Sequence, residues 1–269
     1  MPIRKPWLYL STALLGVSLA SCGAPSGEGG EAGEAGEGGS PAAVSGEGGE
    51  GGEAGEGGAS NTDLSAGAAR VYVYAQMRGH LAVAKALYDS GDPVAGGPHF
   101  MHPVVEVIAG NPDQFDAEMR NQLTETIEGL ALAAEGGGHA DDVQAQYDAV
   151  IARLDTAMGT ATLAEHAESM SALIGLARHE YGQGVVDGAI DDVIEYQDAW
   201  GFIAATRAAF EARRAEYEDT NVEAAQSLDL ALTALQTLRG AADADPPAPL
   251  SGMRAATTRV QLGFAMFEG

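Results

Sequence analysis

Residues 228–240 read LDLALTALQTLRG, and this stretch decides the fold class. Its leucines, Leu228, Leu232, Leu235 and Leu238, recur at the three- and four-residue spacing of one helical face. The last stretch of the chain repeats the pattern with Met253, Ala256, Val260, Phe264 and Phe267. Sustained alternation with β-branched enrichment, the pattern of a half-buried strand, does not occur from residue 61 onward. The sequence therefore predicts an all-α protein.

The predicted helices form one elongated or duplicated bundle over residues 61–269. Ser90-Gly91-Asp92-Pro93 is expected to end the first helix, and His102-Pro103 to begin the second, with Pro103 at the first helical position. We expect a first helix that Ser60 or Thr62 caps and that runs to about residue 90. Further helices are expected at 103–110, 114–135, 140–158, 161–217 with at least one break, near Gly182 to Gly188, 220–240 and 251–267.

The first 60 residues contain two other segments. Arg4 and Lys5 precede an uncharged run from Trp7 to Ala20, which predicts a signal peptide over residues 1–21. As a helix this run reaches roughly 21 Å, short of the ~30 Å hydrocarbon core of a bilayer. Residues 22–60 begin with Cys22 and continue almost wholly in Gly, Glu, Ala and Ser, which predicts a disordered linker.

Charge and composition exclude several classes of function. The chain has 14 Lys and Arg against 39 Asp and Glu, a formal net charge of −25, so no nucleic-acid partner is expected. Its single cysteine cannot form an internal disulfide. A Gly-x-Ser-x-Gly elbow and a Gly-Lys-Ser/Thr phosphate loop are absent, and Gln183 replaces the second histidine of a His-Glu-x-x-His motif that begins at His179. We therefore expect a protein that is not an enzyme.

The segment GPHFMHPVVE, residues 97–106, is the primary candidate for a metal site. If Pro103 starts a helix that His102 caps, Glu106 follows one turn later and both side chains can face the same way. His99 approaches from the preceding turn, and His80, on an apolar helical face, lies behind them. Imidazole nitrogen and carboxylate oxygen are ligands for iron, copper, zinc and manganese. The alternative is that His102 only caps a helix and Glu106 only favours its N-terminus.

A second candidate cluster follows the glycine-rich break. It contains His179, Glu180, Glu195 and Asp198. If the helix were continuous, Glu195 and Asp198 would form one acidic stripe with Asp187 and Asp191. The alternative interpretation is a solvated helix face.

Two short motifs resemble known families. Leu19-Ala20-Ser21-Cys22 resembles the lipobox of bacterial lipoproteins, and this resemblance implies a lipidated (palmitate-type) Cys22, membrane attachment and an outer-membrane destination in the periplasm or at the surface. Gly97-x-His99-x-x-His102 resembles the Gly-x-His-x-x-Glu signature of the imelysin-like family, helical envelope proteins associated with iron uptake, with His102 in place of the glutamate.

Together these patterns predict a lipid-anchored cell-envelope protein whose helical ectodomain binds a metal cation, iron or copper, through His99, His102, Glu106 and His80. The alternative is a structural or protein-interaction lipoprotein with an envelope partner and no metal. A metal-dependent enzyme is a third hypothesis.

Overall fold

The structure, a computed structural model, describes residues 63–243 and 247–269 and is all-α, as the sequence predicted. The signal segment, Cys22 and the Gly/Glu-rich linker lie outside the described residues. The elements are α1 Ala66–Ser90, α2 Pro93–His102, the π-helical turn η2 Pro103–Ile108, the 3-10 turn η3 Pro112–Gln114, α3 Ala117–Glu135, α4 Ala140–Met158, α5 Leu163–Gly184, β1 Val185–Val186, β2 Ala189–Ile190, α6 Val193–Ala212, α7 Arg214–Arg239 and α8 Leu250–Ala265.

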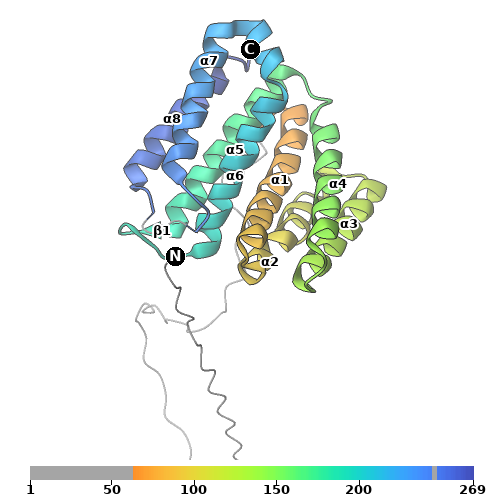
Figure 1. The fold of residues 1–269 in the computed structure, drawn as a ribbon. Coiled ribbons are helices and arrows are strands. Elements are labelled where there is room, and N and C mark those ends of the chain that lie inside the picture. Colours follow the sequence, from red (N-terminus) through yellow and green to blue (C-terminus); the bar gives the residue numbers. More distant parts are fainter. Residues whose placement is uncertain (1–62, 244–246) are drawn as a thin grey trace, which may run out of the picture. The chain divides into compact units, whose positions relative to one another are not determined.

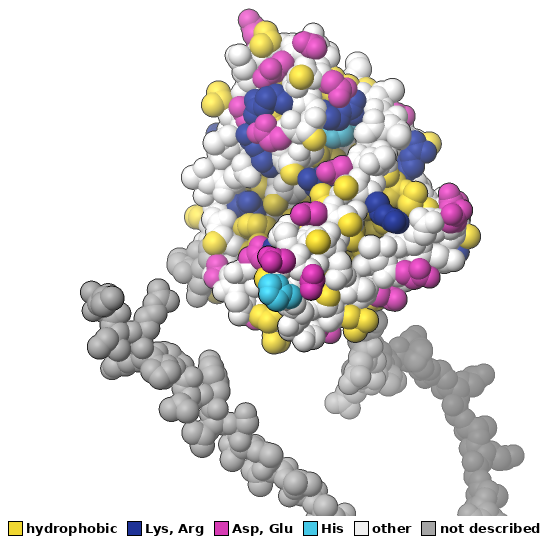
Figure 2. Space-filling model, turned by 45° about the vertical axis from the view of Figure 1, so that its right-hand side comes forward, with side chains coloured by type: hydrophobic (Ala, Val, Ile, Leu, Met, Phe, Trp, Pro, Cys, Tyr) yellow, Lys and Arg dark blue, Asp and Glu magenta, His cyan; other side chains and the backbone are white. Residues whose placement is uncertain are grey.

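Helix α1 occupies the centre of the bundle. It contacts α2, α4, α5 and α6, while α7 and α8 pack on each other and α8 packs on α5 (Figure 1). The apolar faces predicted around Leu228 and Val260 point into the core. Asp and Glu side chains are spread over the visible face and interspersed with Lys and Arg (Figure 2). Among the described helices, none combines the length and the apolar character that crossing a bilayer requires.

Helix α2 begins ten residues earlier than the sequence predicted. Gly91, at φ 92°, donates to the Tyr88 carbonyl and Asp92 N–H donates to the Leu87 carbonyl, which closes the end of α1. The Asp92 side chain then accepts from Ala95 N–H, with Pro93 at the first helical position. The same four residues therefore stop one helix and start the next, and the prediction of an irregular segment before His102 was wrong.

His102 is an interior residue of a continuous turn rather than a helix cap. Its φ and ψ are −51° and −39°, and its side chain makes no capping hydrogen bond. Pro103 lacks an N–H donor, and the chain widens there into η2 instead of ending. His99, His102 and Glu106 consequently follow one another along a single helical path.

The predicted break in the long helical segment is confirmed. A two-residue antiparallel hairpin, β1 with β2, separates α5 from α6, and its turn has positive φ at Asp187 and Gly188. This hairpin interrupts the acidic stripe that a continuous helix would have formed. A further break lies near Arg213, between α6 and α7, at a position that the sequence did not indicate, and α7 is itself kinked at Asn221.

Two glycines allow α1 and α6 to cross at very short range. A Cβ on Gly201 would overlap the carbonyl oxygen of Gly79, and a Cβ on Gly79 would overlap the Phe202 ring. His80 directly follows Gly79, and Asp198 precedes Gly201 by nearly one helical turn. The crossing therefore controls the distance between these two side chains.

We expect Gly201→Ala to lower the free energy of unfolding by about 1–3 kcal/mol, because the added methyl forces two backbones apart. Urea denaturation of the full chain measures this change. Gly182→Ala is the matched control, since a Cβ there meets open space in α5 and gains helix propensity. Equal stability of the two variants would contradict the crossing.

A buried histidine joins α5 to α7. His166 Nδ1 lies 2.8 Å from the Tyr217 hydroxyl, and both residues are almost fully buried. Burial, assisted by the charge of Arg213, lowers the pKa of His166 to about 3. His166 is therefore neutral in the folded protein at pH values where an unfolded histidine is charged.

The depressed pKa of His166 predicts acid sensitivity of the fold. Between its folded pKa of about 3 and the unfolded value of about 6.5, the unfolded state binds more protons, so stability falls as pH falls through this window. From about pH 7 to about pH 5, this group should remove about 2 kcal/mol of stability. His166→Gln cannot titrate, and urea denaturation should show a shallower pH dependence for it. Parallel curves for the two proteins would contradict the assignment.

Candidate metal centre

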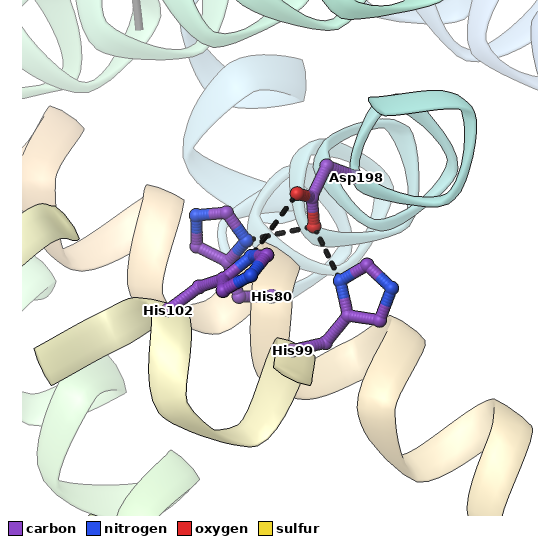
Figure 3. A group of neighbouring side chains, drawn as sticks. All are labelled: His80, His99, His102 and Asp198. Atoms are coloured by element: carbon purple, nitrogen blue, oxygen red, sulfur yellow. Dashed lines mark hydrogen bonds and ion pairs between the residues drawn. The ribbon is translucent and has the colours of Figure 1, made fainter. Parts of the chain in front are cut away.

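Three histidines and one aspartate from three helices meet inside the bundle. His80 comes from α1, His99 and His102 from α2, and Asp198 from α6 (Figure 3). One potential ligand atom from each lies within 4.8 Å of all the others. This is the group with metal-ligating potential among the described residues.

The Asp198 carboxylate faces the Nδ1 atom of all three imidazoles. Its Oδ1 lies 2.8 Å from Nδ1 of His80 and 2.8 Å from Nδ1 of His99. Its Oδ2 lies 3.2 Å from Nδ1 of His102. An ionised carboxylate only accepts hydrogen bonds, so each ring donates its Nδ1–H to Asp198.

The Nε2 atoms of the same rings face other groups. Nε2 of His80 lies 3.8 Å from Oε2 of Glu106, and Nε2 of His102 lies 3.5 Å from Oε1 of Glu106. Nε2 of His99 lies 2.9 Å from Oε1 of Gln197. Glu106 therefore borders two of the three rings on the side opposite Asp198.

The side chains of the centre differ in solvent exposure, from fully buried to partly exposed. The side chains of His80 and His99 have no exposed area and that of Asp198 has 4%, whereas His102 has 12% and Glu106 has 26%. Burial alone would raise the pKa of Asp198. The electrostatic interaction with His80 and the hydrogen bonds from the three imidazoles outweigh burial and hold this pKa well below its usual range.

Ring contacts fix the orientation of the imidazoles. His80 packs edge-on against Phe202, with ring centroids 4.9 Å apart, and against His102 at 5.1 Å. His99 packs edge-on against His102, also at 5.1 Å. Rings held by packing and by one nitrogen present the other nitrogen in a defined direction, as a preorganised site requires.

The structure brings together His80, His99 and His102 of the primary candidates, with Glu106 at their border. Of the secondary candidates, Asp198 belongs to the centre. His179, Glu180 and Glu195 do not belong to the group: His179 is exposed near the end of α5, Glu180 is buried in α5, and Glu195 is partly exposed near the start of α6. The hairpin separates His179 and Glu180, on α5, from Asp198 on α6, whereas Glu195 shares α6 with Asp198 but is partly exposed.

Gln197 is the polar contact that the sequence did not indicate. It is 5% exposed and holds His99. The available signal was the adjacent pair Gln197-Asp198 on α6, where the neighbours Tyr196 and Ala199 are buried. Two consecutive polar residues within a buried stretch indicate polar partners from another element.

One family model matches the chain, that of the iron permease-associated 4-helix bundle domain, over residues 159–251. Comparisons with curated proteins and with solved structures found no match. The matched segment spans α5, α6 and α7 and the first residues of α8, so it includes Asp198 and Gln197. His80, His99 and His102 precede it. This part of the chain is therefore similar to a domain associated with iron permeases.

The match corrects the family assignment based on short motifs. The resemblances to bacterial lipoproteins, through Cys22, and to the imelysin-like family, through Gly97-x-His99-x-x-His102, were wrong as identifications, because the family model that matches is the iron permease-associated one. The reason is the brevity of the motifs: three residues before one cysteine, and two matching positions in a chain with 37 glycines, carry little information.

Proposed function

We propose that the helical domain binds a metal cation, iron in the first place, at the centre formed by His80, His99, His102 and Asp198, and that it serves iron uptake. The convergence of these four side chains from three helices carries the proposal. Four potential ligands within 4.8 Å, separated in the sequence by up to 118 residues, form a preformed donor set rather than a local spacing pattern.

The donor chemistry supports a transition metal. Imidazole nitrogen with carboxylate oxygen suits iron, copper, zinc and manganese, whereas calcium and magnesium prefer oxygen alone. The similarity of residues 159–251 to an iron permease-associated domain supports iron among these metals. Copper, the other metal that the sequence suggested, is the competitor to measure beside it.

The charge of the protein favours cation capture. The chain has a formal net charge of −25, and acidic side chains are distributed over the surface in Figure 2. An acidic field of this kind raises the local concentration of cations and speeds their association.

A structural role for the same residues is the second candidate. Asp198 already accepts hydrogen bonds from three imidazoles, so the network can join α1, α2 and α6 by itself. In that case the residues would stabilise the bundle without binding an ion.

Calorimetric titration of Fe²⁺ without oxygen, and of Cu²⁺ and Zn²⁺, into the full chain separates the two functions. We expect about one ion per chain for the wild type. His102→Ala should bind at least about 100-fold more weakly, since loss of even an outer partner of a metal ligand costs roughly 10–100-fold. His179→Ala, an exposed histidine, is the matched control and should bind like the wild type.

Circular dichroism confirms that each variant is folded before titration. Absence of stoichiometric binding by the folded wild type, or equal binding by His102→Ala, would overturn the metal function and leave the structural one.

We also propose that the chain is exported to the cell envelope. Arg4 and Lys5, followed by the uncharged run from Trp7 to Ala20, support export. Two charged substitutions in that run, Leu14→Arg with Leu15→Arg, should leave the protein in the cytoplasm. Cell fractionation measures this, with His179→Ala as the control that should travel like the wild type. Identical fractionation of all three proteins would contradict export.

A further inference from the structure

We infer that the ion is held on the Nε2 side of the imidazoles, by His80 Nε2, His102 Nε2 and the Glu106 carboxylate, while Asp198 is an outer carboxylate that orients the two rings. The inference rests on the proposed metal function and specifies which atoms perform it. It assigns Glu106 as a ligand and Asp198 as a positioning residue.

The tautomers favour the Nε2 side. A neutral imidazole has one N–H, and the nitrogen without the proton is the one that can bind a metal. Because the Nδ1 atoms of His80 and His102 face the acceptor Asp198 at 2.8 and 3.2 Å, the proton of each ring resides on Nδ1. Each Nε2 then presents its lone pair. Metal-binding histidines commonly donate their other nitrogen to a carboxylate in this way.

The distances to Glu106 fit an ion between the groups. Two ligand atoms about 2.1 Å from the same ion lie about 3.4 Å from each other in tetrahedral geometry and about 3.0 Å in octahedral geometry. The Glu106 oxygens lie 3.5 Å from Nε2 of His102 and 3.8 Å from Nε2 of His80, so an ion fits between the groups once they close by less than about 1 Å. The contacts of Asp198, at 2.8 to 3.2 Å, are instead those of ordinary hydrogen bonds.

Solvent reaches the Nε2 side of the imidazoles, near Glu106, more readily than the Nδ1 side, near Asp198. Glu106 is 26% exposed and His102 is 12% exposed, whereas Asp198 is 4% exposed. An ion that arrives from solvent therefore meets the Glu106 carboxylate first. Glu106 belongs to η2, and π-helical turns within helices are frequent at functional sites.

His99 has a different role from the one that the sequence suggested. Its Nδ1 contacts Asp198 and its Nε2 contacts Gln197 at 2.9 Å, so both nitrogens are engaged within the protein. His99 thus holds the outer carboxylate in place.

The ligand set points to an exchangeable ferrous ion. Two imidazoles and one carboxylate with the remaining positions open form the arrangement that non-haem Fe²⁺ sites use. Three protein ligands at a partly exposed position leave room for water on the ion. Such a site suits capture and release of Fe²⁺ better than permanent storage, because open positions allow ligand exchange.

Nuclear magnetic resonance of the full chain with nitrogen-15-labelled histidine tests the assignment directly, with Zn²⁺ as a diamagnetic probe. Long-range proton–nitrogen correlations show which nitrogen of each ring binds the metal and which keeps its proton. We expect metal-bound Nε2 and protonated Nδ1 for His80 and His102, and no metal bond for His99. His99→Gln identifies the signals of that ring.

Two carboxylate variants supply an independent measurement by Fe²⁺ calorimetry without oxygen. Glu106→Gln removes a charged ligand and should weaken binding by more than about 100-fold, whereas Asp198→Asn should weaken it by roughly 10–100-fold, the range for an outer partner. Glu195→Gln, which lies outside the group, is the matched control and should have no effect.

The outcomes separate this inference from the proposed function. One Zn²⁺ per chain bound through Nδ1, with Nε2 protonated, would overturn the assignment to the Nε2 side and leave the metal function intact. A loss of binding in Asp198→Asn that exceeds the loss in Glu106→Gln, with both variants folded, would do the same. Absence of stoichiometric binding by the wild type would overturn both.

Discussion

The close crossing of α1 and α6 is the constraint on which the metal centre depends. Gly79 and Gly201 have no side chains, so the two backbones meet where any Cβ would overlap its neighbour. Because His80 directly follows Gly79 and Asp198 lies nearly one turn before Gly201, this contact brings an imidazole and a carboxylate to 2.8 Å. The packing of the core and the geometry of the centre are thus set by the same pair of residues.

At that crossing, Asp198 is the centre of a buried hydrogen-bond network. A buried carboxylate without partners is costly, and here three imidazoles satisfy it. Two of those rings arrive on α2, which exists because Asp92 starts a new helix directly after Gly91 ends α1. The network therefore joins the part of the chain similar to an iron permease-associated domain, on α6, to helices that precede it.

The predicted and observed helix boundaries differ for physical reasons. Ser90-Gly91-Asp92-Pro93 was interpreted as a stop followed by an irregular segment, yet a left-handed glycine and an aspartate cap can adjoin, so the signals for an end and a start overlap. Pro103 favours the start of a helix because proline lacks an N–H donor. In the structure a π-helical turn accommodates it within a continuous path.

The sequence by itself determined the helical class, the inward position of His80 and the spacing of His99, His102 and Glu106, because periodicity and turn spacing are properties of a single helix. Only the tertiary structure decided that Asp198, 118 residues after His80 and 96 after His102, faces both rings, and that Gln197 holds His99. Contacts of this range depend on where helices cross, and the crossing is set by packing against several neighbours at once, which no local pattern in the chain encodes.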